Sequence, residues 1–160
     1  MPESSAAVPA TNSTPSDTVL YNEKLWPNMW VWLVSAGLSG AGILVLAPVS
    51  LAAGFTAAVV LFVIIAVLLV LSTPAITVTG STLRVGRATI ERRFVGSASA
   101  FRGAEATAER GTRLNGLAFQ CIRGWIDPVV RMEITDPSDR TPYWLTSTRH
   151  PDKLLAALNS

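Results

Sequence analysis

The chain divides into three parts by its pattern of apolar and polar residues. The first 24 residues are largely polar, residues 25–83 contain no Asp, Glu, Lys, Arg or His, and residues 84–160 carry charges throughout. A bilayer core about 30 Å thick needs about 20 apolar residues to cross it as a helix. The uncharged run is therefore too long for one crossing and of suitable length for two.

A break inside the uncharged run separates two predicted helices. Pro48 and Ser50 belong to a turn-like sequence that ends one apolar segment and begins the next. We expect membrane spans near residues 29–46 and 51–71. The second span holds thirteen Leu, Ile, Val or Phe residues from Phe55 to Leu71, which favours insertion by roughly 4 to 8 kcal/mol. The alternative is a buried hairpin in a soluble protein, and the remaining chain is too short to cover two all-apolar helices.

Small residues recur four positions apart in both predicted spans. This spacing places the two members of a pair on one helix face, where two backbones can approach closely. We expect these faces to form the contact between the spans, and the alternatives are a dimer face or no special role. The pairs are Ala36/Gly40, Gly37/Ala41, Ala53/Ala57 and Gly54/Ala58.

The segment before the first span combines a polar tail with a group of aromatic residues. Residues 1–20 are rich in Ser, Thr, Pro and Ala, which predicts a disordered tail. A cleavable signal is not expected, because no positive charge precedes an early apolar core. Amphipathic rings favour the headgroup zone of a bilayer, so we predict four membrane-interface anchors. They are Tyr21, Trp26, Trp30 and Trp32.

Residues 72–160 predict a small antiparallel β domain closed by a helix. Short β-prone runs at residues 76–78 and 82–85 flank a turn at Gly80. Pro151 opens a helix whose Leu residues share one face. Six or seven strands followed by a helix resemble a pleckstrin-homology-like (PH-like) barrel at the level of fold. Further strands are expected at residues 88–95, 97–101, 117–122, 129–135 and 143–147, with a short helix at 104–110.

Two stretches of the sequence carry a family resemblance. The first is Tyr21-Asn22-Glu23-Lys24-Leu25-Trp26-Pro27, with tryptophans after it. The second is the run DPSDRTPYWLTSTRHP at residues 136–151. Together they resemble an actinobacterial family of uncharacterised integral membrane proteins, domain of unknown function 3093, over about residues 20–158. The resemblance implies a membrane protein of high-GC Gram-positive bacteria, and it implies no activity.

Composition and charge indicate where in the cell the protein is expected. Charged residues make up 15% of the chain and hydrophobic residues 49%, against about 25% charge in a typical domain, which excludes an ordinary soluble enzyme over the whole length. Lys and Arg near the spans favour the cytoplasmic side. They flank the predicted hairpin on both sides and are missing from the turn inside it. We therefore expect a two-span protein of the cell membrane, with both termini and the β domain in the cytoplasm.

The sequence offers little catalytic chemistry. His150 is the only histidine and Cys121 the only cysteine, so one chain has no zinc site of nitrogen and sulfur ligands. Asp136 and Asp139 lie in a turn-like sequence and are interpreted as turn residues. We expect no enzymatic activity, no cofactor and no metal. Residues 72–160 contain 12 Lys or Arg against 8 Asp or Glu, too weak an excess to predict nucleic-acid binding.

The basic residues after the second span are the functional lead. Near an anionic leaflet each contributes about 1 kcal/mol of attraction. We predict a surface that contacts anionic lipid headgroups or a protein partner, such as another membrane protein or a second copy of the chain. The alternatives are that these residues only set topology, or that the protein is a structural subunit of an envelope complex assembled through its spans. The predicted contact residues are Arg84, Arg87, Arg92, Arg93, Trp125 and Trp144.

Overall fold

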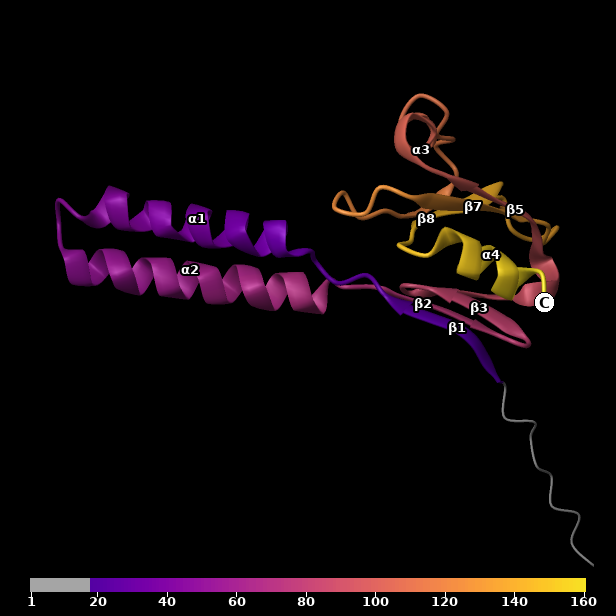
Figure 1. Ribbon diagram of the computed structural model, residues 1–160, viewed down its shortest axis with the longest axis horizontal. Helices are drawn as coiled ribbons and strands as arrows, with labels where there is room; N and C mark the ends of the chain where they lie inside the picture. Colours follow the sequence, from indigo (N-terminus) through magenta and orange to yellow (C-terminus); the bar gives the residue numbers. More distant parts are fainter. Residues whose placement is uncertain (1–17) are drawn as a thin grey trace, which may run out of the picture.

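The computed structural model describes residues 18–160 and consists of a helical hairpin that projects from one end of a β domain (Figure 1). Helices α1 (Met29–Leu46) and α2 (Leu51–Leu71) have the bounds expected for the two spans. The carboxyl terminus lies at the opposite end of the β domain (Figure 1). The predicted disordered tail lies outside the described residues up to residue 17, whereas Val19 and Leu20 already belong to a strand.

The β domain is built from two four-stranded sheets. Sheet A has the order β1-β2-β3-β4, with strands Val19–Lys24, Ala75–Thr79, Thr82–Val85 and Ala88–Glu91. Sheet B has the order β5-β7-β8-β6, where β5 is Val95–Phe101, β7 is Val129–Ile134, β8 is Tyr143–Ser147 and β6 is Phe119–Cys121. The remaining elements are the 3-10 turn η1 (Arg92–Phe94) and the helices α3 (Gly103–Arg110) and α4 (Pro151–Leu158).

Strand β1 precedes the hairpin in the chain and pairs with β2, which follows it. The two strands are antiparallel, with Lys24 opposite Ala75, and the Leu25 N–H donates to the Pro74 carbonyl at 3.0 Å. The hairpin is therefore inserted between two neighbouring strands of one sheet. Sheet A therefore combines β1, which lies before the domain boundary that we expected at residue 72, with β2, β3 and β4, which lie after it.

Two expectations about the strands are wrong. The domain is not wholly antiparallel, because β6 runs parallel to β8, with Phe119 opposite Trp144. The run 88–95 is not one strand, because η1 ends sheet A after Glu91 and the chain enters sheet B at Val95. A pattern of apolar residues indicates which side of a strand is buried and carries no information on strand direction. The PH-like comparison stays a prediction, and the closing helix α4 is observed where expected.

The main core lies between the two sheets and α4. It includes Ile76 and Leu83 from sheet A, Met132 from sheet B and Leu154 from α4, all fully buried. A second, smaller core lies beneath α3 and takes its residues from the other face of sheet B, so that all of β8 is buried. Trp144 lies in β8 and is only 5% exposed, so its assignment to a contact surface is wrong.

The two hairpin helices meet through small residues. Gly54 and Ala58 are the buried residues of α2, which confirms that pair as a contact face. On α1 the buried residues are Ser35 and Ser39, whose hydroxyls donate to carbonyls one turn back, at 2.7 and 2.8 Å. The other pairs predicted for the contact do not form its buried centre, because α1 turns its serines toward α2 instead.

Gly54 allows the closest approach of the two helices. A Cβ atom there would lie 3.2 Å from both the Cα and the carbonyl oxygen of Ile43, whereas a Cβ at Gly40 meets nothing within 4 Å. We expect Gly54→Leu to separate the helices and lower the melting temperature of the full chain in neutral detergent. Gly40→Leu is the matched control and should melt like the wild type. Equal melting of both variants would contradict this view of the hairpin.

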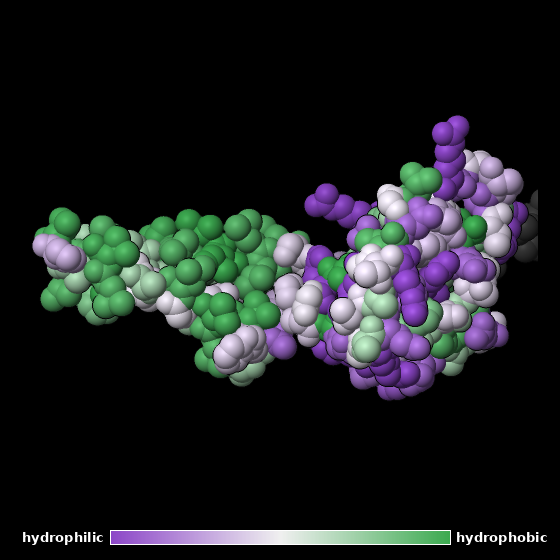
Figure 2. Space-filling view, turned by 90° about the horizontal axis from the view of Figure 1, so that it is seen from above, coloured by the Kyte–Doolittle hydropathy of each residue, from purple (hydrophilic) through white to green (hydrophobic). Residues whose placement is uncertain are grey.

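Most of the hairpin surface is apolar and uncovered. Both helices are long and apolar enough to cross a membrane. Figure 2 shows apolar surface over most of the hairpin face in view, against a mixed surface on the β domain with many hydrophilic residues. Large side chains such as Leu44 and Leu71 remain more than three-quarters exposed, at 78% and 77%. Within the described residues, the only extensive packing of each helix is against the other.

Candidate functional site

Strand direction separates the four arginines that we predicted as one cluster. β2 leads away from the hairpin, β3 returns toward it, and β4 leads away again. Arg84 and Arg87 therefore lie at the end of the domain nearest the hairpin. Arg92 and Arg93 follow β4 and lie at the far end, so they are not beside the hairpin as we expected, and their contact with a protein partner stays a prediction.

The two distal arginines make contacts within the domain. Arg92 donates through Nη2 to the carbonyl oxygens of Leu158 and Ser160, at 2.9 and 3.0 Å. These bonds fasten the end of α4, where helical carbonyls lack partners within the helix. The Arg93 Nε lies 2.8 Å from a Glu91 carboxylate oxygen. The contacts of Arg92 and Arg93 therefore contribute to holding the β domain together.

Loops of sheet B hold both ends of the hairpin. We call the two connecting segments, residues 24–28 and 72–74, the neck. On one side of the neck, the Trp26 carbonyl accepts hydrogen bonds from Trp125 Nε1 at 3.1 Å and from Arg149 Nη2 at 2.5 Å. On the other side, Arg123 Nη2 donates to the Ser72 carbonyl at 2.6 Å. The neck is thus fixed to the domain by cationic and aromatic side chains.

Tyr21 is part of the domain core and not a membrane anchor, because β1 turns its side chain inward. It is 9% exposed, and its hydroxyl donates to Glu23 Oε2 at 2.6 Å. The same oxygen accepts a hydrogen bond from Thr148 Oγ1 at 2.5 Å, and Glu23 Oε1 accepts one from the Arg149 N–H at 2.9 Å. Burial, aided by the bond to Glu23, raises the pKa of the Tyr21 hydroxyl. The network ties β1 to the end of β8.

The three tryptophans predicted as anchors lie at the neck and the start of α1. Trp26 and Trp30 are exposed, and Lys24 Nζ lies 4.2 Å from the centre of the Trp26 ring. Trp32 is half-buried and lies beside Phe62 of α2, with ring centres 6.5 Å apart. Their positions suit a headgroup zone, and the anchoring role itself stays a prediction.

An open cavity of about 650 Å³ lies beside the neck. Its volume falls in the range of small-molecule sites. Three arginines contribute to its walls, and no Asp or Glu of the described chain does so. We call it the neck cavity. It is lined by Leu71, Ser72, Thr73, Pro74, Ala75, Thr77, Arg84, Val85, Gly86, Arg87, Phe119, Gln120, Cys121 and Arg123.

The β3–β4 turn forms one wall of the neck cavity. Gly86 has a φ of 60°, which suits the first position of a two-residue type II′ turn and favours glycine. A Cβ there would lie 3.4 Å from Pro74 Cβ and 3.6 Å from Cys121 Sγ. The turn places Arg87 at its tip, and Arg84 leans toward it, with Nε 3.4 Å from the Gly86 carbonyl. Two exposed guanidinium groups thus lie on one wall.

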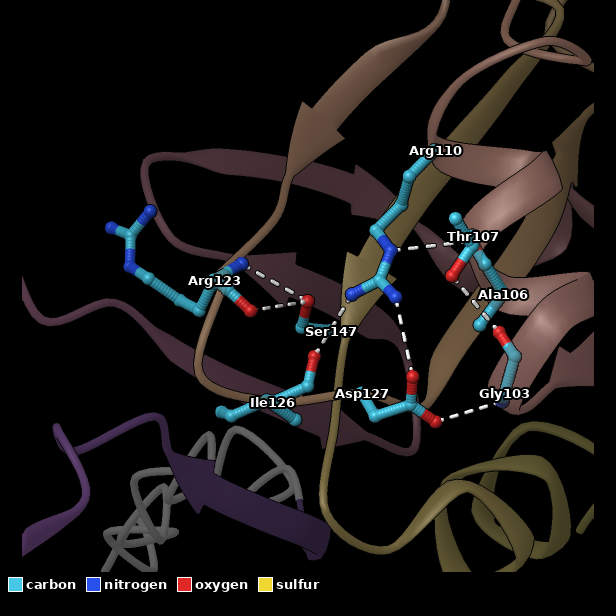
Figure 3. Close-up of polar contacts among 8 residues, drawn as sticks. All are labelled: Gly103, Ala106, Thr107, Arg110, Arg123, Ile126, Asp127 and Ser147. Atoms are coloured by element: carbon cyan, nitrogen blue, oxygen red, sulfur yellow. Dashed lines mark hydrogen bonds and ion pairs between the residues drawn. The ribbon is translucent and has the colours of Figure 1, made fainter. Parts of the chain in front are cut away.

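Arg123 forms another part of the cavity lining. Its backbone is held by Ser147 Oγ, which accepts from its N–H at 3.0 Å, and its guanidinium points away from the neighbouring Arg110–Asp127 pair (Figure 3). In that pair the Arg110 charge is balanced by Asp127 at 3.3 Å. Arg123 donates only to carbonyls, and its Nε is buried without a hydrogen-bond partner in the described chain. Its charge is therefore uncompensated.

Cys121 lines the neck cavity and is only 7% exposed. Burial raises the pKa of its thiol, against the opposing charge of Arg123. Since the thiolate is the nucleophile, we expect iodoacetamide to alkylate the native chain far more slowly at pH 8 than the denatured chain. Mass spectrometry of the single cysteine gives both rates. Equal alkylation rates for the native and the denatured chain would contradict the burial of the Cys121 thiol.

The turn between β7 and β8 has the predicted turn chemistry. Asp136 Oδ1 accepts hydrogen bonds from the N–H and the hydroxyl of Ser138, at 2.9 and 2.7 Å, and these bonds lower the pKa of its carboxyl group. Asp139 Oδ1 accepts from the Thr141 N–H at 2.8 Å. His150 precedes α4 and its carbonyl accepts from Leu154, as expected for a residue at a helix start.

Sequence reasoning missed two of the cations near the neck, Arg123 and Arg149. Each stands outside the basic run that follows the second span. A signal was available at Arg123, because the sequence Arg123-Gly124-Trp125 places a cation beside an aromatic residue in a loop. Trp125, which we did predict, is half-buried at the neck, and the Arg123 guanidinium lies 5.9 Å from its ring centre.

The chain matches a described protein family. Residues 20–158 match a family described as protein of unknown function (DUF3093). The match takes in β1, the hairpin, both sheets and α4. No curated protein and no solved structure matches the chain.

Proposed function

The chain belongs to the DUF3093 family of proteins of unknown function, and we propose that it is a two-span membrane protein whose β domain binds anionic lipid headgroups. One observation carries the proposal: the apolar hairpin leaves the domain at the end where several cations lie that form no ion pair with a carboxylate of residues 18–160. We call these cations the basic collar, and they are Lys24, Arg84, Arg87, Arg123 and Arg149.

Insertion of the hairpin into a bilayer is supported by its dimensions and its surface. At 1.5 Å per residue, the 18 and 21 residues of α1 and α2 span about 27 and 32 Å, close to a hydrocarbon core of about 30 Å. Monomeric soluble proteins rarely expose an apolar surface of this extent. Lipid would cover the side chains that the protein itself leaves uncovered.

The orientation follows from strand pairing and charge. Because β1 pairs with β2, a hairpin inserted in a bilayer would have both ends on the same side of the membrane, which supports the proposed topology. The connection between α1 and α2 carries no charge, whereas the basic collar surrounds the neck. Cations next to spans are retained in the cytoplasm. We therefore place the domain and both termini of the chain on the cytoplasmic side.

The position of the basic collar supports headgroup binding. At the surface of an anionic leaflet, each Lys or Arg contributes about 1 kcal/mol. The exposed rings of Trp26 and Trp30 lie at the same end of the domain and suit the interfacial zone. The role proposed is binding, and no catalytic step is part of it.

A groove on the hairpin favours a second candidate, a subunit that assembles through its spans. The groove has a volume of about 300 Å³ and an almost wholly apolar lining that includes Gly40, Ala58 and Phe62. Another transmembrane helix would fit such a surface. Cross-links from this groove to a second protein, without cross-links from the β domain, would favour this candidate over the first.

Membrane insertion is tested by alkaline carbonate extraction and by protease access. The full chain should stay in the vesicle pellet after carbonate treatment. Tags at the two termini should be cleaved together and only from the cytoplasmic side. Release of the chain by carbonate, or cleavage of either tag from the opposite side, would refute the proposed topology.

Headgroup binding is tested on the full chain in neutral detergent. Titration with dioctanoyl phosphatidylglycerol should raise the melting temperature, because a ligand that binds only the folded state stabilises it. Dioctanoyl phosphatidylcholine is the uncharged control. The stabilisation should fall as salt rises, because screening weakens contacts between exposed charges. An equal response to both lipids would refute anionic headgroup binding.

A further inference from the structure

We propose that the neck cavity is a binding site for a phosphomonoester group, held by Arg84, Arg87 and Arg123. If the phosphate belongs to a lipid headgroup, the inference rests on the proposed function. It specifies the chemical group that the neck cavity recognises. A lipid or a small soluble molecule could carry that group. The basic collar attracts any anionic surface, whereas the neck cavity would select one kind of anion.

The charges on the cavity walls favour a ligand with more than one negative charge. Three guanidinium groups line the cavity, with no Asp or Glu among its lining residues in the described chain. Neither Arg84 nor Arg87 forms an ion pair with a carboxylate of residues 18–160. A phosphomonoester carries about 1.5 to 2 negative charges at pH 7. A phosphodiester carries one and leaves more of the cationic charge uncompensated.

The hydrogen-bonding groups also suit phosphate. A guanidinium group presents a planar fork of donors that matches two phosphate oxygens. Arg84 and Arg87 are exposed on the β3–β4 side of the cavity, so their forks are available to a ligand. Nη1 and Nη2 of Arg123 each donate one N–H to a carbonyl, and each carries a second N–H. A phosphate oxygen in the cavity would accept hydrogen bonds from these second N–H groups.

The position and size of the cavity leave room for the group attached to the phosphate. Leu71, the last residue of α2, lies on its rim, so a headgroup can enter from the proposed membrane surface. Phe119 and Cys121 provide apolar surface beside the arginines. The volume of about 650 Å³ exceeds that of a phosphate group alone. The site therefore suits a phosphate at the end of a larger molecule.

The test compares two double variants with the same change in net charge. Arg84→Gln/Arg87→Gln removes two of the cavity cations, and Arg93→Gln/Arg140→Gln removes two exposed cations outside it. Calorimetric titration of the full chain in neutral detergent uses dioctanoyl phosphatidic acid, dioctanoyl phosphatidylglycerol and glycerol 3-phosphate. The first lipid is a phosphomonoester, the second is a phosphodiester, and glycerol 3-phosphate is a soluble phosphomonoester.

We expect phosphatidic acid to bind more tightly than phosphatidylglycerol. The cavity variant should weaken that binding on the order of a hundredfold, because each charged hydrogen-bonding group contributes about tenfold or more. The control variant should weaken it by no more than about fivefold, as for exposed charges. Arg84→Lys/Arg87→Lys keeps the charge and loses the fork, so its affinity should fall between those of the wild type and the cavity variant.

The outcomes separate this inference from the proposed function. If both double variants lose the same affinity, or if the two lipids bind equally, the phosphomonoester site is refuted while anionic headgroup binding stands. If glycerol 3-phosphate binds at least as tightly as phosphatidic acid and depends on Arg84 and Arg87, the site stands with a soluble ligand. If glycerol 3-phosphate binds in this way and neither anionic lipid binds, the proposed function alone is refuted. Equal melting of the unliganded variants checks their folding.

Discussion

Residues 72–160 expressed alone are expected not to fold. This fragment contains seven of the eight strands, but it lacks β1, the edge strand that covers β2. It also lacks Leu25, which is fully buried, and Tyr21, which is 9% exposed, both part of the main core. Without them β2 loses one of its two hydrogen-bonded neighbours and the core is opened to water. Circular dichroism and the dispersion of amide proton signals measure the loss of structure.

A linked version of the domain is the matched control. Residues 18–26 joined through Asn-Gly to residues 73–160 replace the hairpin with a two-residue turn, a sequence that suits a β-hairpin connection. The register of β1 and β2 continues to Leu25 and Pro74, so the turn closes without a shift. We expect this version to unfold cooperatively. Cooperative unfolding of the fragment 72–160 to the same degree would show that β1 is dispensable.

Glu23→Ala is expected to destabilise the β domain by about 2–4 kcal/mol. Glu23 accepts hydrogen bonds from Tyr21, Thr148 and the backbone of Arg149 in a buried environment. Loss of the carboxyl group leaves these donors without their acceptor. The hydroxyls of Tyr21 and Thr148, which lie 3.1 Å apart, can still bond to each other and keep the cost below the sum of three lost bonds. Thermal unfolding of the full chain in neutral detergent measures the effect.

Two further variants locate the source of that effect. Tyr21→Phe keeps the buried ring and removes one hydroxyl, so it should cost about 1 kcal/mol. Glu105→Ala removes an exposed carboxyl group from the first turn of α3 and should cost less than about 1 kcal/mol. A loss at Glu105 as large as the loss at Glu23 would indicate an effect of overall charge and not of the buried network.

The hairpin was predictable because one property, the long run of uncharged apolar residues, determines its structure. A long uncharged run needs a helix to satisfy its backbone and a break to turn, and both helix bounds agree with the expected spans. The contact face was only partly predictable. Gly54 and Ala58 were found from their spacing, but Ser35 and Ser39 were not, because a serine that bonds to its own helix behaves as a small residue.

Strand β1 was missed because a charged residue occupies one of its inward positions. Tyr21, Glu23 and Leu25 alternate inward, which is the pattern of a half-buried strand, but Glu23 breaks the apolar series. Its burial depends on donors from residues 148 and 149, more than 120 positions away in the chain. A single sequence gives no indication of such a distant partner, so the segment was interpreted as a tail and an anchor.

The candidate site was predictable only in part for a similar reason. Arg84 and Arg87 were found as cations close to the second span, and their neighbours Arg92 and Arg93 were grouped with them. The group divides because β3 and β4 reverse direction at Gly86, which sends the last two residues to the far end of the domain. Arg123 joins the site from sheet B, through a loop that sequence proximity does not connect to the hairpin.

The insertion of the hairpin between β1 and β2 has a consequence for biogenesis. During translation β1 leaves the ribosome first and has no partner until both spans and β2 have been made. If only one span entered the bilayer, β1 and β2 would emerge on opposite sides of the membrane and could not pair. In the proposed topology, folding of the domain thus acts as a check on correct membrane integration, and a misintegrated chain would present an unfolded domain to cellular proteases.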